Sequence, residues 1–129
     1  MKKRKLPKPT DGELAILRVL WRRGRGTVRE VHTELGAIQN AGYTTVLKLM
    51  QIMAEKGLVT RNESQKSHVY TPVMTEKEAQ RRFLGELLDR LFDGSAHQLV
   101  LQALSTRKAS PEEVAGIRKL LDDMEKGVK

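Results

Sequence analysis

Cysteine is absent from the 129 residues of this chain. Its absence excludes disulfide bonds, cysteine nucleophiles and thiolate metal ligands, and it fits a reducing compartment. Long apolar runs are absent too. The basic opening MKKRKLPKP is not followed by the apolar stretch that a signal peptide needs, and no segment has the length of apolar sequence that spans a bilayer. We therefore expect a cytoplasmic protein.

The sequence also lacks the motifs of common enzymes. It contains no GxSxG, HExxH or P-loop, and the segment 24–26 (GRG) is too short to cradle a nucleotide. The three histidines lie far apart, without the spacing of metal ligands on a helix: His32, His68 and His97. Each is expected to be a surface or hydrogen-bonded residue. The sequence thus predicts neither an enzyme nor a metal or cofactor site.

Positive charge is concentrated in the first part of the chain. Residues 1–74 contain 14 Lys or Arg and 6 Asp or Glu, whereas residues 75–129 contain 10 of each. The whole excess of +8 therefore lies before residue 75, which is typical of a two-part molecule with one face for a polyanion. The alternative is a solubility tail, because residues 1–8 carry five of these charges. Without that tail the first part still has a net charge of +3.

Capping boxes and hydrophobic periodicity predict six helices. In a capping box, Ser or Thr is followed three residues later by Glu or Gln, and two free amides are satisfied. Five pairs fit: Thr10–Glu13, Thr27–Glu30, Thr75–Glu78, Ser95–Gln98 and Ser110–Glu113. The expected helices cover residues 11–23, 28–35, 42–57, 76–92, 96–106 and 111–126. Glycines at positions 24 and 57 are expected to end the first and the third.

Between the third and fourth helices the period changes to that of strands. Residues 58–61 and 69–73 look extended, with a polar turn over 62–68, so we expect a β-hairpin. Three helices followed by a hairpin is the order of a winged helix-turn-helix domain. The predicted fold is mainly α with a small β-hairpin.

The third helix carries residue types suited to reading DNA. No Asp or Glu occurs over residues 43–54, so no carboxylate would face the phosphates on either side of a groove. Thr44 and Thr45 offer hydroxyl and methyl groups to base edges, and Lys48 lies one turn further on. The two threonines also suit an ordinary helix start; the basic charge and the hairpin favour the reading role. The predicted base-reading residues are Thr44, Thr45, Leu47, Lys48 and Gln51.

Cations on neighbouring elements predict contacts with the sugar-phosphate backbone. Arg61 and Lys66 lie on or beside the hairpin turn, where a wing commonly contacts phosphate, although a solvated turn is the alternative. Arg25 and Arg29 lie where the second helix begins, an end that approaches phosphate in helix-turn-helix docking. Tyr70 is expected to pack in the core or at its rim rather than to stack on a base. The predicted backbone-contacting residues are Arg25, Arg29, Tyr43, Arg61 and Lys66.

The last three helices predict a dimerisation region. The 55 residues from 75 onward are too few to enclose a core alone, and the helix over 96–106 is apolar on most sides. A second copy of the chain would cover it; the alternative is that these helices fold back on the winged-helix domain of one monomer. We expect a basic tail over 1–8, a winged-helix domain over 9–74 and a helical dimerisation domain over 75–126.

Several runs resemble the penicillinase-repressor family of transcriptional regulators, the BlaI/MecI type. They are ELAILRVLW, YTTVLKLMQIMAEKGLV and VYTPV, and FLGELLDRLFDGSAHQLVLQAL and SPEEVAGIRKLL are similar to that family's dimerisation region. The resemblance covers about residues 9–125. It implies a homodimeric winged-helix repressor on palindromic TACA/TGTA operators, often upstream of β-lactamase or penicillin-binding-protein genes. It also implies a dimer interface on Phe83, Leu87, Leu91, Leu101, Leu104, Ile117, Leu121 and Met124.

Two features of the family are missing. Antibiotic-responsive members depend on a membrane sensor protease and are cleaved at an Asn-Phe bond in the first dimerisation helix. This chain has Glu86-Leu87 at the matching place and no Asn-Phe pair anywhere. Copper-responsive relatives use paired cysteines near the C-terminus, which this chain also lacks. The resemblance therefore predicts a repressor without predicting its inducing signal.

Two other functions remain as alternatives. A sequence-indifferent architectural or RNA-associated module would use the basic tail as its main anchor, and deletion of residues 1–8 would remove most of its affinity. A protein-interaction module would bind another protein through its winged helix and would have negligible affinity for DNA even at low salt. The charge distribution and the third helix favour sequence-specific DNA binding.

Overall fold

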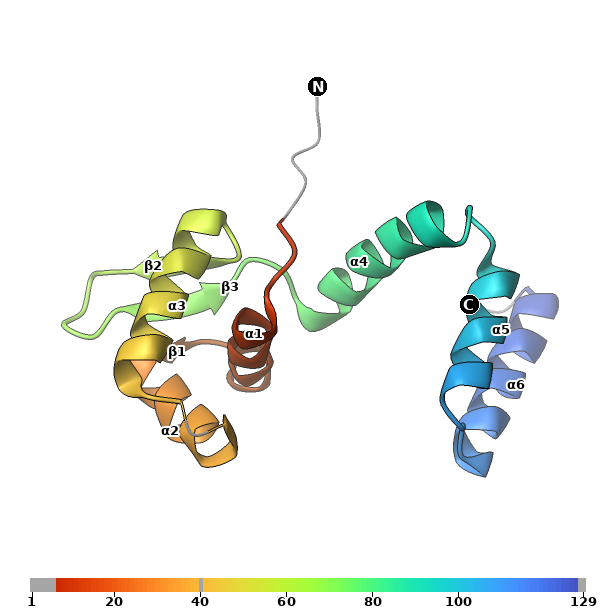
Figure 1. Cartoon of the computed structure of the whole chain (residues 1–129), viewed down its shortest axis with the longest axis horizontal. Coiled ribbons are helices and arrows are strands. Elements are labelled where there is room, and N and C mark those ends of the chain that lie inside the picture. Colours follow the sequence, from red (N-terminus) through yellow and green to blue (C-terminus); the bar gives the residue numbers. More distant parts are fainter. Residues whose placement is uncertain (1–6, 40, 128–129) are drawn as a thin grey trace, which may run out of the picture. The chain divides into compact units, whose positions relative to one another are not determined.

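The computed structural model describes residues 7–39 and 41–127 and divides between residues 83 and 84 into two compact units (Figure 1). Its elements in chain order are α1 (Asp11–Arg23), β1 (Gly26–Thr27), α2 (Val28–Gln39), α3 (Tyr43–Lys56), β2 (Val59–Asn62), β3 (Val69–Pro72), α4 (Glu76–Leu91), α5 (Ala96–Thr106) and α6 (Pro111–Glu125). Among the described residues, no helix combines the length and the apolar character needed to cross a membrane. The mainly α fold with a small antiparallel sheet is confirmed.

The capping residues explain where the helices begin and end. Four predicted boxes make both hydrogen bonds, at 2.9 to 3.2 Å: Thr10–Glu13, Thr27–Glu30, Thr75–Glu78 and Ser110–Glu113. At the start of α5, the amide of Gln98 donates to Oγ of Ser95 at 3.1 Å. Gly24 and Gly57 cap the ends of α1 and α3 with φ angles of 89° and 87°, values that favour glycine. The local sequence therefore specifies the helices well.

The sheet contains one strand more than the sequence predicts. The expected hairpin is present as β2 and β3, but the two-residue strand β1 also pairs with β3, giving the order β1-β3-β2. Gly26 lies opposite Tyr70 and Thr27 opposite Val69. Two residues are too short for a periodic pattern, so only the folded chain reveals this strand. Helix α2 likewise continues to Gln39, about one turn beyond its expected end.

The core of the first unit lies between α1, α2, α3 and the sheet (Figure 1). Helix α1 is buried on most of its sides. Ile16 and Val19 are almost fully buried, whereas Leu14 and Trp21 are only half-buried. The reason is that α1 contacts α2, α3 and β3 and therefore has little free surface. Tyr70 is 1% exposed, as expected for a core residue rather than a base-stacking one.

The start of α4 belongs to the first unit and packs on its core. Nε1 of Trp21 donates a hydrogen bond to the carbonyl oxygen of Met74 at 2.9 Å, and Ala79 is buried. Phe83 lines a small cavity of about 20 Å³ with these residues. These contacts explain why the division between the units falls within α4, after residue 83.

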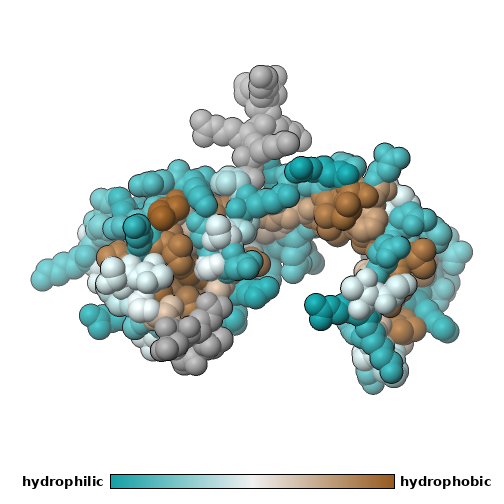
Figure 2. All heavy atoms as spheres, viewed as in Figure 1, coloured by the Kyte–Doolittle hydropathy of each residue, from teal (hydrophilic) through white to brown (hydrophobic). Residues whose placement is uncertain are grey.

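The second unit has no buried side chain among its described residues, 84–127. Its large hydrophobic side chains are instead exposed, including Leu91 at 69% and Met124 at 66%. The others are Leu84, Leu87, Val100, Leu101, Leu104, Val114, Leu120 and Leu121. Figure 2 shows hydrophobic residues at the surface of this part of the chain, drawn in brown. By itself, this unit does not enclose a hydrophobic core.

A buried ion pair joins the beginning of α1 to the end of α3. The side chain of Glu13 is 2% exposed, and Nζ of Lys56 lies 3.0 and 2.9 Å from its two carboxylate oxygens. The backbone amide of Thr10 donates to the same carboxylate at 2.9 Å. Burial by itself raises the pKa of Glu13, but the Thr10 amide and the Lys56 ammonium outweigh it, and the pKa is lowered. This ion pair fixes α3 against α1.

We predict that Glu13→Gln lowers the free energy of unfolding by about 2 kcal/mol at neutral pH, because the amide retains the Thr10 cap but loses the ionic contacts with Lys56. Since the pKa of Glu13 is lower in the folded chain, its contribution is fully present above the ordinary value of 4.5 and is lost as the pH falls through the lowered value. Denaturant unfolding of both proteins over an acidic pH series measures the difference.

The control for this measurement is Glu63→Gln, which removes an exposed ion pair with Arg61. Its cost should be much smaller than that of Glu13→Gln, because solvent screens an exposed pair. A difference between wild type and Glu13→Gln that stays constant down to the most acidic conditions would contradict the assigned role of the Glu13 carboxylate.

Candidate nucleic-acid interface

The first turns of α3 present polar side chains to solvent. Thr44, Thr45, Lys48 and Gln51 are exposed and Leu47 is half-buried, whereas the opposite face of the helix packs in the core. The N-cap position is occupied by Gly42, with no side-chain cap hydrogen bond, and the first turn contains no acidic residue. The two threonines therefore do not cap this helix. Their hydroxyl and methyl groups face outward together with the ammonium group of Lys48.

A cleft of about 290 Å³ lies beside these residues, between the start of α2, one side of α3 and the turn that joins β2 to β3. Five predicted DNA-contacting residues line it: Arg29, Tyr43, Leu47, Gln51 and Lys66. The sequence did not assign the other lining residues to a site: Thr27, Val28, Ser67, His68 and Tyr70. Among the residues that the structure describes, no Asp or Glu lines the cleft. Its charge is therefore positive without a carboxylate to balance it.

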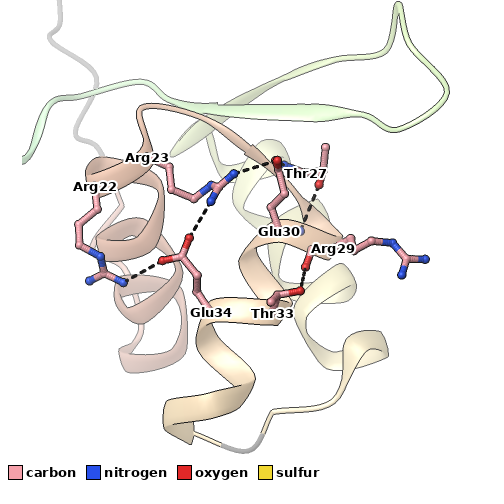
Figure 3. A network of polar contacts seen from close by, with 7 residues as sticks. All are labelled: Arg22, Arg23, Thr27, Arg29, Glu30, Thr33 and Glu34. Atoms are coloured by element: carbon pink, nitrogen blue, oxygen red, sulfur yellow. Dashed lines mark hydrogen bonds and ion pairs between the residues drawn. The ribbon is translucent and has the colours of Figure 1, made fainter.

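Two arginines at the end of α1 are held by carboxylates of α2. Figure 3 shows Glu34 between Arg22 and Arg23, at 3.5 and 2.8 Å, and Arg23 also reaches Glu30 at 2.8 Å. The hydrogen bond with Arg23 lowers the pKa of Glu34, and the amide of Thr27 together with Arg23 lowers that of Glu30. The guanidinium group of Arg29 points away from this network (Figure 3).

The four predicted backbone-contacting cations fall into two groups. Arg29 and Lys66 share the cleft that lacks carboxylates. Arg25 instead lines a depression with Glu30, and Arg61 is bound by Glu63 at 2.6 Å. Hydrogen bonds with Tyr70 and with Glu63 raise the pKa of Arg61. In this structure Arg29 and Lys66 are thus better placed than Arg25 and Arg61 to meet a phosphate.

Tyr43, at the start of α3, has a neighbour that the sequence did not indicate. The ring of His32 on α2 meets the ring of Tyr43 edge to face, with centroids 5.7 Å apart and an interplanar angle of 84°. The Tyr43 side chain remains 44% exposed. This contact orients a side chain at the border between the exposed tip of α3 and the cleft. Across the described ranges, no three His, Asp or Glu side chains are grouped so that they could hold a metal ion.

Comparisons with known proteins agree with this geometry. The sequence model of the family described as penicillinase repressor matches residues 9–123. The transcriptional regulator BlaI of Mycobacterium tuberculosis is 32% identical over 124 residues, covering 95% of this chain and 89% of that protein. The penicillinase repressor of Bacillus licheniformis is 24% identical over 120 residues, covering 93% of this chain and 94% of that protein.

Two solved structures are similar to the first unit. One is the solution structure of the DNA-binding domain of the repressor BlaI, with a TM-score of 0.52 and 25% identity; it covers 59% of this chain and 93% of that domain. The other is the Bacillus licheniformis BlaI monomeric form in complex with the blaP half-operator, with a TM-score of 0.50 and 26% identity over 57% and 90%. The chain belongs to the penicillinase-repressor family, and it is a winged-helix, DNA-binding transcriptional repressor rather than an enzyme.

Proposed function

We propose that this repressor is a homodimer that binds a palindromic operator of the TACA/TGTA type and controls β-lactamase genes or other cell-wall or stress-related genes. The observation that carries the proposal is the exposed start of α3, where Thr44, Thr45 and Lys48 face solvent and no carboxylate is present. The similar BlaI structure from Bacillus licheniformis is a complex with the blaP half-operator, which supports the same use of this unit here.

In this proposal α3 enters the major groove. The hydroxyls of Thr44 and Thr45 bond base edges or phosphates, their methyl groups contact thymine methyls, and Lys48 reaches a phosphate or a guanine. The carboxamide of Gln51, exposed two turns further along, suits the two hydrogen-bonding groups of adenine. The phosphates on either side are met by cations outside α3, foremost Arg29 and Lys66.

The second unit supplies the dimer in this proposal. Among its described residues no side chain is buried, and hydrophobic side chains on α4, α5 and α6 remain in water. A second copy of the chain offers the same apolar surfaces, and covering them would give both copies a shared core. Residues 84–129 contain 7 Lys or Arg and 8 Asp or Glu, so this unit brings little net charge to the association.

Repression in this proposal is occlusion in the cytoplasm: two copies of α3 enter successive major grooves on one face of the duplex, roughly 34–36 Å apart, and cover the promoter. Glu86 and Leu87, at the place where antibiotic-responsive relatives carry their cleavable bond, lie within α4. Release by a membrane sensor protease would therefore require cleavage of a different bond.

The reading role of α3 predicts sequence-dependent binding. In a gel-shift titration at moderate salt, wild type should prefer a palindromic TACA/TGTA duplex over a scrambled duplex of equal length. Thr45→Ala should reduce this preference by about 1–3 kcal/mol through loss of a base contact. Lys48→Ala should weaken binding to both duplexes through loss of a phosphate contact. Thr106→Ala and Lys77→Ala make the same side-chain changes outside α3 and serve as controls that should bind like wild type. Equal affinity of wild type for both duplexes would reject the proposal.

If the second unit forms the dimer, a charged residue placed in its apolar surface should lower the mass at which the protein sediments. Wild type should sediment at about twice the chain mass of 14.6 kDa. Leu91→Asp on α4 and Leu121→Asp on α6 should each shift the protein toward the monomer, because a carboxylate would be buried in an apolar interface. Arg90→Asp places the same charge beside Leu91 as a control. A monomeric wild type at micromolar concentration, or two leucine variants that remain dimers, would contradict the proposed interface.

A further inference from the structure

His68 lies in the turn between β2 and β3 and lines the cleft described above. It is exposed, and on that cleft it joins two cations from different elements, Arg29 at the start of α2 and Lys66 in the same turn. The remaining polar groups on the cleft are neutral side chains of Thr27, Tyr43, Gln51, Ser67 and Tyr70. Three basic side chains therefore face one space from two sides, and no acidic side chain among the described residues lines it with them.

The carboxylates on neighbouring elements line other depressions, not this cleft. Glu30, although close to the start of α2, is bound to Arg23 and to the amide of Thr27, and it lines a different depression. Glu55 and Glu63 line a third depression together with Arg61, which Glu63 binds. The groups that face His68 from α2, α3 and its own turn are thus cationic or neutral. An anion is the ligand that would balance this charge.

We propose that this cleft is a subsite for a phosphate of the DNA backbone and that His68 is its third cation, which makes the affinity for DNA depend on pH. The inference rests on the proposed function, and it names a contact and a form of regulation that the function alone does not require. The DNA backbone is favoured over a free anion because Leu47 and Gln51 of α3 form one wall of the cleft. A phosphate bound there lies beside the helix that reads the bases.

The chemistry of the contact follows from the imidazole group. Histidine side chains change charge between about pH 5 and pH 8. When protonated, His68 donates two N–H groups and carries a full positive charge, as phosphate oxygens require. When neutral, it retains one donor and no charge. Acidification should therefore add one ionic phosphate contact, and each such contact releases counterions in proportion to its charge.

The test uses the full chain and a fluorescently labelled operator duplex, with anisotropy titrations over a series of salt concentrations at about pH 6 and about pH 8. For wild type, the plot of log affinity against log salt should be steeper at the lower pH by about 0.9, the value for one additional phosphate contact. At fixed salt, affinity should rise by about fivefold, the upper end for an exposed ion pair. Equal slopes at both pH values would overturn the inference.

Substitutions at the cleft separate His68 from other titrating groups. In His68→Gln, the salt slope should be the same at both pH values and equal to that of wild type at the higher pH. His68→Lys should show the steeper slope at both. His32→Gln and His97→Gln should retain the wild-type difference. His68 lies in an exposed turn, so these changes should leave folding intact. A slope difference that persists in His68→Gln would assign the titration to another group and overturn the inference.

Arg29 and Arg23 provide a matched pair for the cationic cleft. Arg29→Gln should reduce the salt slope by about 0.9 at both pH values. Arg23→Gln should leave it unchanged, because that guanidinium group is bound by Glu30 and Glu34. A reduced salt slope in Arg23→Gln together with an unchanged slope in Arg29→Gln would overturn the assignment of the cleft as the phosphate subsite.

Two further measurements identify the source of the phosphate and distinguish a failure of this subsite from a failure of the proposed function. Inorganic phosphate added at constant ionic strength should weaken wild type and His68→Gln equally. Selective loss in wild type would mean that the cleft takes the free ion and would overturn the assignment to DNA. The slopes are also measured on a scrambled duplex. If the operator is not preferred, the proposed function fails, while the pH-dependent slope on the scrambled duplex still decides whether the subsite exists.

Discussion

The carboxylates of the first unit decide which of its cations are already paired within the protein. Glu34 and Glu30 bind Arg22 and Arg23, and Glu63 binds Arg61. In the described part of the chain, no carboxylate lies within ion-pair distance of Arg29, Lys48 or Lys66. A cation already paired within the protein must exchange one anionic partner for another on binding DNA and gains little. The unpaired cations release counterions for their full charge.

Two of these carboxylates act twice, which links local structure to tertiary structure. Glu30 accepts the amide of Thr27 at the start of α2 and also binds Arg23 of α1. Glu13 accepts the amide of Thr10 at the start of α1 and also binds Lys56 at the end of α3. In each case the glutamate of a capping box begins a helix and fixes it to another. The orientation of α3 therefore depends on an ion pair far from its exposed tip.

The sequence predicted what depends on local pattern and missed what depends on pairing in space. Most helix starts followed from Ser and Thr spaced three residues before Glu or Gln, and the polar start of α3 followed from its residue types. The strand β1 has two residues and is defined only by its partner β3. Arg22 and Arg29 look equivalent in the sequence, and only the fold places Glu34 beside the first. For the same reason His68 gave no signal: its cleft is built from residues of three separate segments.

The balanced charge of residues 75–129 complements the basic first part. In the proposed dimer, two copies of residues 1–74, each with an excess of +8, are held on one duplex, and their mutual repulsion is offset only when phosphates are present. An interface of hydrophobic side chains without net charge holds the two copies together at any salt concentration, because apolar burial is not screened. Salt and pH then act on DNA binding alone, through the cations around α3. Once one copy of α3 has bound, the linkage between the two chains keeps the second copy of α3 at high effective concentration. In the proposed dimer, an apolar interface and a separate cationic surface would therefore let the DNA contact weaken without dissociating the two copies.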